Sequence, residues 1–208
     1  MITKKQIFFV HGGEAFKNYT DYLDYLKNRP VSLEKYQSWR NEYLTQKLGS
    51  YFDIISPQMP GKENAKYLEW KINFERYLPY LKNNLTLIGN SLGGVFLAKY
   101  LSENKFPKKI KTLILVAPPY SNKLSGEYFA GGFKLKKDLS LITKNCQQVV
   151  LFFSEDDQVV PLDHAASYAT NLPTAKLFVL KNKNGHFRVS KFPEIVKLIK
   201  DCYNLNKL

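Results

Sequence analysis

One serine of this chain lies in a pattern of glycines that is typical of a catalytic nucleophile. Residues 89–94 read Gly-Asn-Ser-Leu-Gly-Gly, so Ser91 fits the motif G-x-S-x-G. In this motif a strained turn between a strand and a helix lifts the serine hydroxyl above the sheet, and the glycines let backbone segments pass closely. An apolar segment, 85–88, precedes the turn, and a helical pattern, 92–101, follows it. This context favours a nucleophile over the simpler alternative, a Gly-Ser turn that only caps a helix.

A serine hydroxyl is a poor nucleophile near neutral pH and needs a base within hydrogen-bonding distance. Of the three histidines in the chain, His186 is the candidate for that base, because it follows the last predicted strand in the loop Asn-Gly-His-Phe. It would take the proton from Ser91 and later deliver it to the leaving group. For His11, after the first predicted strand, and His164, in a helical segment, the simpler interpretation is a partly exposed surface histidine.

The imidazole in turn needs a carboxylate that holds its tautomer and stabilises the imidazolium. Three acidic residues follow the fifth predicted strand in the segment 154–161, Ser-Glu-Asp-Asp-Gln-Val-Val-Pro. Asp157 is preferred, because it lies four residues before Pro161, where the chain turns into the next helix. Glu155 and Asp156 are interpreted as solvated surface charge.

Two backbone N–H groups must stabilise the oxyanion that develops on the substrate. Leu92, directly after the nucleophile, supplies one of them. The second is expected from the loop His-Gly-Gly-Glu that follows the first predicted strand. Gly13 is the preferred donor, because glycines permit the backbone to approach closely.

The candidate residues follow short apolar segments that alternate with helical patterns along the chain. The clearest helical patterns are 63–81, 92–101 and a C-terminal helix capped by Ser190 with Pro193 in its first turn. This alternation predicts an α/β fold with a doubly wound parallel sheet whose strands are covered on both faces. Ligands of such sheets bind outside the carboxyl ends of the strands, which is where the candidate residues lie. The predicted strands are 6–10, 52–56, 85–88, 112–116, 149–153 and 177–180.

Two long connections leave the carboxyl ends of predicted strands. The segment 14–50 reads as an insertion of two amphipathic helices, and the segment 120–148 reads as a lid-like connection. Both are expected above the candidate site, where their aromatic side chains either pack as ordinary core residues or line a substrate pocket. The second segment contains Tyr128, Phe129, Gly131, Gly132 and Phe133.

Length and composition argue against several other classes of protein. The 208 residues favour a single domain, 1–208, and no apolar segment approaches the roughly 18 residues of a membrane span or resembles a secretory signal. Only four of the 31 basic residues behind the net charge of +13 are arginine, and the lysines are dispersed, so we expect no nucleic-acid partner. Cys146 and Cys202 form neither a disulfide framework nor a metal-ligand pattern, which favours a reducing, cytoplasmic compartment.

The ordered motifs together resemble α/β-hydrolase-fold serine hydrolases. They are His11-Gly12-Gly13, Gly89 to Gly94, Asp157 to Pro161 and Gly185-His186-Phe187. The order Ser91, Asp157, His186 is that of the family. More narrowly, the small size and the segment 154–161 resemble the compact branch that contains bacterial YdeN-like proteins and the retinoblastoma-binding-protein-nine type. The resemblance spans the chain from about residue 6 to the C-terminal helix, and it implies a three-layer αβα fold reduced to six parallel strands in the order 2-1-3-4-5-6.

The sequence therefore predicts a carboxylesterase-like serine hydrolase that forms an acyl-enzyme on Ser91 and needs no metal or organic cofactor. Its expected substrate is a small-molecule carboxylic ester, with thioesters and amides left open. The surplus of positive charge favours anionic substrates, if it bears on the chemistry at all. The alternative from another class is a scaffold of the same fold that acts mainly by binding a protein partner, with little or no turnover.

Overall fold

Six parallel strands form one central sheet in the order β2-β1-β3-β4-β5-β6. The computed structural model describes residues 4–33, 37–121 and 130–205. The observed order is the one that the resemblance implied, so that prediction is confirmed. Each strand begins and ends within two residues of its predicted bounds. The strands are β1 (Lys5–Val10), β2 (Phe52–Ile55), β3 (Leu85–Asn90), β4 (Ile110–Val116), β5 (Val149–Ser154) and β6 (Lys176–Leu180).

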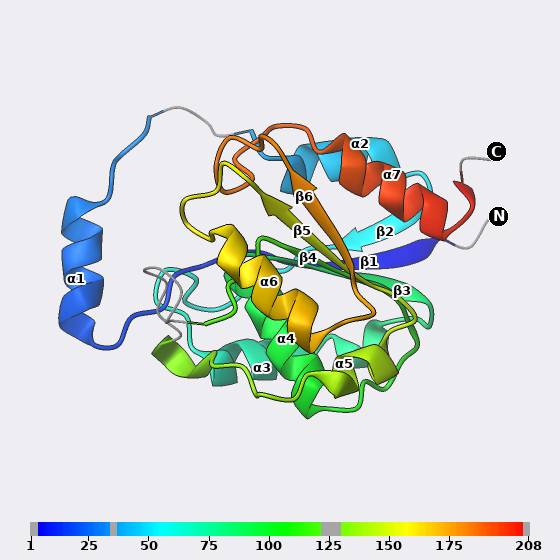
Figure 1. The fold of residues 1–208 in the computed structure, drawn as a ribbon, viewed down its shortest axis with the longest axis horizontal. Helices are drawn as coiled ribbons and strands as arrows, with labels where there is room; N and C mark the ends of the chain where they lie inside the picture. The colour runs from blue at the N-terminus through cyan, green and yellow to red at the C-terminus, as the bar shows by residue number, and fades with distance from the viewer. Residues whose placement is uncertain (1–3, 34–36, 122–129, 206–208) are drawn as a thin grey trace.

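Helices cover both faces of the sheet, as Figure 1 shows. On one face lie α3 (Tyr67–Glu75), α4 (Leu92–Glu103), α5 (Ser140–Asn145) and α6 (Leu162–Asn171), and on the other lie α2 (Leu44–Leu48) and α7 (Pro193–Cys202). Successive side chains of a strand point to opposite faces. In β1, Phe8 and Val10 therefore join the core under α3 and α4, whereas Ile7 and Phe9 join the core under α2 and α7. This is the predicted three-layer fold.

The edge strand β6 departs from the expected burial. Leu177, Phe178 and Val179 are each about 40% exposed (38%, 39% and 41%), so this strand is not covered on both faces. An apolar run of four residues does not distinguish an edge strand from a central one, because only the position in the sheet decides which faces are covered. For β6, the prediction of a strand buried on both faces is wrong.

Two helix predictions also need correction, and a third is confirmed. The pattern 63–81 is divided into α3 and a 3-10 turn, Leu78–Tyr80, whose Pro79 cannot continue the ladder of helical hydrogen bonds. The helix predicted at 92–101 is present and extends to Glu103. The predicted cap Ser190 does not cap the last helix: α7 begins at Pro193 after Phe192, with no side-chain cap. None of the helices within the described ranges is long and apolar enough to span a membrane.

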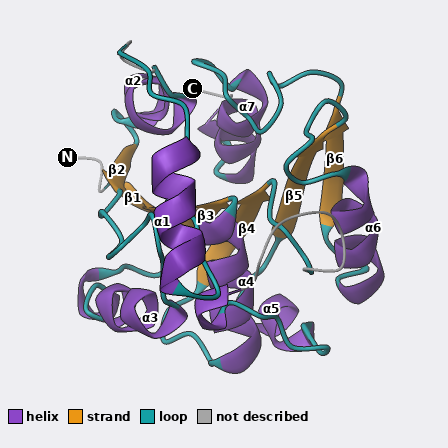
Figure 2. Ribbon diagram, turned by 90° about the vertical axis from the view of Figure 1, so that its left-hand side faces the viewer, coloured by secondary structure: helices purple, strands orange, loops and turns teal. Residues whose placement is uncertain are grey.

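The two halves of the segment 14–50 differ in where they lie relative to the sheet. The first half forms α1 (Tyr19–Asn28), which has no buried residue and stands beyond the carboxyl ends of the strands, away from the helices that pack on the sheet (Figures 1 and 2). The second half forms a short π-helical turn, Trp39–Tyr43, that continues into α2. Trp39 and Leu44 are fully buried in the core under α7. The second predicted helix is therefore part of the helix layer and does not lie over the strand ends.

The connection 120–148 contributes to the core where the structure describes it. Residues Ala130–Gly132 form a 3-10 turn with Gly131 at a φ of 65°, and Phe133 is fully buried. The ring of Phe133 packs edge-on against Tyr67 and Trp70 at centroid distances of 5.9 and 5.3 Å. Of the two interpretations of these aromatics, core packing therefore holds for Phe133. Tyr128 and Phe129 lie outside the described residues.

Candidate active site

Ser91 occupies a strained turn between β3 and α4. Its φ is 52° and its ψ is −125°, a conformation that costs energy for a residue with a side chain. The backbone N–H of Ser91 donates to the carbonyl of Val116 at 2.8 Å, which ties the turn to the end of β4. Only 8% of the residue is exposed. The sequence context expected of a nucleophile elbow is thus present in the structure.

Two glycines make this turn sterically possible. A Cβ atom on Gly89 would lie 2.5 Å from the carbonyl oxygen of Gly93. A Cβ atom on Gly93 would collide with the carbonyl oxygens of Val10 and His11 at the end of β1. The first turn of α4 therefore crosses the strand ends at a distance that only glycine allows.

Asp157 and His186 are brought together from two different loops. The Nδ1 atom of His186 lies 2.7 Å from Oδ2 of Asp157, and the Asp157 side chain is fully buried. The other carboxylate oxygen, Oδ1, accepts hydrogen bonds from the backbone N–H groups of Val159 and Val160, both at 2.9 Å. With its second oxygen occupied in this way, the carboxylate is held in one orientation toward the imidazole. A carboxylate at Nδ1 favours the tautomer that carries its proton on Nδ1.

The other ring nitrogen of His186, Nε2, is the atom of this residue that can accept a proton. Nε2 is buried, and within the described part of the chain it has no hydrogen-bond partner. In the Nδ1–H tautomer, Nε2 carries the lone pair that can accept a proton. No hydrogen bond joins Nε2 to the hydroxyl of Ser91 in this structure, and such bonds are often long until substrate binds. Because all six strands are parallel, Ser91, Asp157 and His186 nevertheless follow strand ends at the same edge of the sheet.

Asp156 holds the histidine loop and is not the solvated surface charge expected from the sequence. Its Oδ1 accepts from the hydroxyl of Ser154 and from the backbone N–H of Lys183 at 3.0 Å, and its Oδ2 accepts from the N–H of Gly185 at 2.8 Å. Desolvation opposes ionisation of this group, but the hydrogen bonds prevail and lower the pKa of the Asp156 carboxyl to about 2. Only the folded loop reveals this role, because three adjacent acidic residues look alike in sequence.

The two candidate oxyanion donors, Leu92 and Gly13, come from the turn that holds the nucleophile and from the loop after β1. Leu92 is the first residue of α4, and a Cβ atom on Gly12 would lie 3.1 Å from Cβ of Ser91, so the loop after β1 passes directly beside the turn. Beyond Gly13, Glu14 donates to the carbonyl of Lys62 at 2.8 Å and accepts from the N–H of Ala65 at 2.7 Å. The N–H groups of Gly13 and Leu92 donate no hydrogen bond to any described residue.

Neither of the other histidines is an ordinary surface residue. His164 is fully buried, and its Nδ1 accepts from the backbone N–H of Tyr120 at 2.8 Å. Nδ1 of His11 lies 2.6 Å from the carbonyl of Gly12, and its Nε2 accepts from the N–H of Met59 at 2.8 Å. Burial lowers the pKa of His11, with a smaller effect from nearby cations. For His164 the surface interpretation is wrong, and His11, although partly exposed, is held through both ring nitrogens.

Trp39 links the insertion to the histidine loop. Its indole N–H donates to the carbonyl of Phe187 at 3.2 Å, and its backbone N–H donates to the carbonyl of Val189 at 3.1 Å. The ring packs edge-on against Phe9 and Phe192. The apolar periodicity of the segment 14–50 predicts an amphipathic helix that includes Trp39, but no local signal indicates the contacts of this residue with a loop almost 150 positions away.

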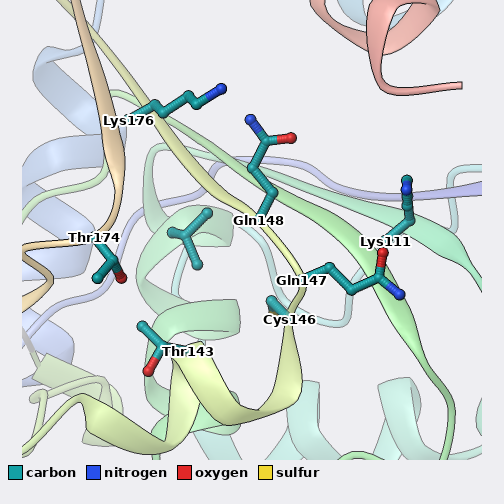
Figure 3. Close-up of a pocket in the computed structure, with 8 residues that line it drawn as sticks. Lys111, Thr143, Cys146, Gln147, Gln148, Thr174 and Lys176 are labelled. Carbon is teal, nitrogen blue, oxygen red and sulfur yellow. The ribbon is translucent and has the colours of Figure 1, made fainter. Parts of the chain in front are cut away.

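A polar cavity lies at the opposite edge of the sheet, far from these residues in the fold. Lys111, Val149 and Lys176, near the amino ends of β4, β5 and β6, line it together with Gln148. Figure 3 shows the side chains of Lys111, Gln148 and Lys176 at this cavity. Within the described ranges, no group of three or more His, Cys, Asp or Glu side chains is arranged to hold a metal ion.

The chain is similar to known proteins in both sequence and fold. The family model described as serine hydrolase matches residues 35–200. The YdeN protein of Bacillus subtilis (strain 168) is 23% identical over 187 residues, which cover 88% of this chain and 86% of that protein. The crystal structure of the ydeN gene product from B. subtilis is similar with a TM-score of 0.72 and 17% identity, covering 97% of this chain and all of that one.

A carboxylesterase structure from Nitrososphaera gargenis is also similar. Its TM-score is 0.63 at 14% identity, covering 99% of this chain and 92% of that one. At such identities the structural similarities show a shared fold.

Proposed function

Because this chain belongs to the serine hydrolase family, with an α/β-hydrolase fold like that of the YdeN protein, we propose that it hydrolyses carboxylic esters through an acyl-enzyme on Ser91. The observation that carries this proposal is the pair of Asp157 and His186. The carboxylate engages Nδ1 of the imidazole at 2.7 Å and leaves Nε2 buried, with no partner among the described residues, at the edge of the sheet where the Ser91 turn lies.

In the proposed first half-reaction, the hydroxyl oxygen of Ser91 attacks the ester carbonyl and its proton passes to Nε2 of His186. The ionised Asp157 stabilises the imidazolium and keeps the ring in place. The backbone N–H groups of Leu92 and Gly13 stabilise the negative charge on the carbonyl oxygen. Collapse of this intermediate breaks the ester bond, and the alcohol leaves with the proton from His186.

In the proposed second half-reaction, water replaces the alcohol. His186 takes a proton from the water, whose oxygen attacks the acyl carbon, and the intermediate collapses to release the acid and regenerate the Ser91 hydroxyl. The carboxylesterase fold similarity supports the choice of an ester as substrate, while thioesters and amides require the same groups.

Steady-state hydrolysis of p-nitrophenyl butyrate tests the proposal. The wild-type protein is expected to turn over the ester, and Ser91→Ala is expected to lower kcat by more than about 10³-fold, since only binding and the oxyanion donors remain. A variant with wild-type activity would exclude Ser91 as the nucleophile. A Ser102→Ala variant in the same helix controls for effects on folding.

A further inference from the structure

The polar cavity at the amino ends of β4, β5 and β6 has a volume of about 420 Å³, within the usual range for sites that bind small molecules. Its walls are the strand ends, the end of α5 and the connection from α6 to β6. The residues that line it are polar except for Cys146 and Val149. The proposed hydrolysis makes no use of this cavity, because it lies at the opposite edge of the sheet from Ser91.

Two lysines on different strands line the cavity. Lys111 belongs to β4 and Lys176 to β6, with β5 between them. Neighbouring strands lie about 4.8 Å apart, so the two backbones are about 10 Å apart, and the flexible stems of the lysines can converge on one ligand. Neither ammonium group forms an ion pair with a described residue.

Acidic side chains do not offset these two charges. No Asp or Glu occurs in β4, β5, β6 or α5, nor in the connections that end at the cavity, which are 104–109, 146–148 and 172–175. On α7, which packs over one face of the sheet, Glu194 is paired with Lys183 at 2.6 Å. Asp201, next to the end of α7, is exposed and has a partner of its own. The side chains around the cavity therefore carry a surplus of positive charge.

The carboxyl ends of two helices also bear on this charge. α5 ends at Asn145 and α6 at Asn171, and each helix end has a partial negative charge of at most about half an elementary charge. Lys144, in the last turn of α5, complements the first of these ends. The two full charges of Lys111 and Lys176 outweigh what remains, so the cavity favours an anion.

Gln148 adds a hydrogen-bond donor with a fixed direction. Its Oε1 accepts from the thiol of Cys202 on α7 at 3.2 Å, which leaves the amide NH₂ group free to donate. Figure 3 shows the amide nitrogen on the side of Lys176 and the oxygen directed away from it. Val150 pairs with Lys176, so Gln148, two residues before Val150, is a diagonal neighbour of Lys176 on the same face of the sheet. An acceptor placed between the amide and the ammonium group would receive hydrogen bonds from both.

Donors from three strand ends suit an anion with more than one charged group. Lysine binds phosphate as a compact point charge, whereas carboxylates are matched better by the planar fork of arginine. We propose that this cavity binds a small anion that carries a diphosphate group, with Lys111 and Lys176 contacting its two phosphates and Gln148 donating to the phosphate nearer Lys176. The proposal does not depend on the role of Ser91.

Isothermal titration calorimetry with inorganic pyrophosphate tests the site. The wild type is expected to bind one pyrophosphate, and to bind inorganic phosphate at least about tenfold more weakly, because a single phosphate cannot engage both lysines fully. Lys111→Gln and Lys176→Gln are each expected to weaken pyrophosphate binding about tenfold, as the loss of one charge-assisted contact predicts. Gln148→Glu places a carboxylate against the ligand and is expected to abolish binding, while thermal unfolding verifies that the variant is folded.

The matched control is Lys47→Gln, which removes the same charge from the last turn of α2. Its affinity for pyrophosphate is expected to lie within twofold of the wild-type value. Absence of pyrophosphate binding in the wild type would overturn the proposal. Equal weakening in Lys47→Gln and Lys111→Gln would also overturn it, because the effect would then come from net charge.

A nucleotide arm distinguishes the source of the diphosphate. ADP carries the same group on a nucleoside, so tighter binding of ADP than of pyrophosphate would identify a nucleotide as the ligand, and equal or weaker binding would identify a free diphosphate. Affinities for both ligands that survive in Lys111→Gln and Lys176→Gln would overturn the site. Ser91→Ala is expected to bind pyrophosphate as the wild type does, so this test and the test of ester hydrolysis fail separately.

Discussion

The imidazole of His186 is bonded to Asp157 through Nδ1 at 2.7 Å, while its Nε2 is buried and has no partner among the described residues. The two residues are 29 positions apart in sequence and come from the loops after β5 and β6. Their contact fixes the side of the ring that is available for chemistry. It is the relationship on which the proposed mechanism depends most.

Replacement of Asp157 by asparagine tests that relationship. Asp157→Asn presents an amide to Nδ1, so the ring is expected to change tautomer and lose the acceptor at Nε2. We expect kcat for p-nitrophenyl butyrate to fall by about 10³- to 10⁴-fold. The exposed Asp163→Asn, in the first turn of α6, serves as the control and should behave like the wild type. Activity within tenfold of wild type in Asp157→Asn would mean that another group orients His186.

Asp156 is expected to act as a positioning residue for the histidine loop. In Asp156→Asn, the bonds from Lys183 and Gly185 lose their charged acceptor, and we expect kcat to fall about tenfold with little change in KM. Glu155→Gln removes the neighbouring, exposed carboxylate and is the matched control. Equal kcat and KM values in the two variants would show that Asp156 does not position the histidine loop.

The pH dependence of unfolding gives an independent readout of Asp156. The pKa of this carboxyl is lowered in the folded protein from 3.8 to about 2, so its contribution to stability is present above about pH 4 and is lost as the pH falls through about 2. The difference in unfolding midpoint between wild type and Asp156→Asn should therefore be constant from pH 6 to 4 and shrink toward pH 2. Circular dichroism at fixed ionic strength measures it, and a gap that widens toward pH 2 would contradict the assignment.

The closeness of α4 to β1 predicts the effect of a single added methyl group. Gly93→Ala would drive a Cβ into the carbonyl oxygens of Val10 and His11, so the elbow must shift. We expect a loss of about 1–3 kcal/mol in the free energy of unfolding, together with a large drop in activity. Urea denaturation compares this variant with Ser102→Ala near the other end of the helix. A fully stable and active Gly93→Ala protein would show that the crossing is looser than the structure indicates.

Trp39→Phe separates packing from hydrogen bonding at the histidine loop. The variant keeps an aromatic ring but removes the donor to Phe187, so we expect a loss of about 1 kcal/mol in stability and a severalfold decrease in kcat. Tyr168→Phe loses a comparable buried bond, to Pro119 at 3.1 Å, away from the loop. It should lose stability without losing kcat. If both variants keep full kcat, Trp39 serves the core alone.

The strands and the Ser91 turn could be predicted from the sequence because their signals are local. Largely apolar segments of four or five residues end in glycine, proline or polar turns, and this pattern predicts the bounds of the strands to within two residues. The glycines of the motif around Ser91 meet a steric requirement, because the first turn of α4 crosses the strand ends too closely at Gly89 and Gly93 for most other residues. The pairing of Asp157 with His186 could also be predicted, since both residues lie in loops that follow neighbouring parallel strands.

The structural features that could not be predicted from the sequence depend on contacts between distant segments. The periodicity of the segment 14–50 is the same whether a helix stands clear of the body, as α1 does, or packs in a layer, as α2 does. Asp156 differs from Glu155 only in the backbone N–H groups that the later loop brings to it. His164 is buried, and its Nδ1 accepts from the backbone N–H of Tyr120, which lies 44 residues earlier in the chain. The side chains of β6 are partly exposed, because this strand lies at the edge of the sheet.

The formation of a covalent bond at Ser91 is the central claim, and labelling with a fluorophosphonate probe tests it most directly. Intact mass spectrometry of the wild-type protein is expected to show one added phosphonyl group, and peptide mapping is expected to place it on Ser91. The Ser91→Ala protein should stay unlabelled and inactive toward p-nitrophenyl butyrate, while Ser102→Ala should label fully. A wild-type protein that folds but takes no label, or that is labelled at another residue, would contradict the account.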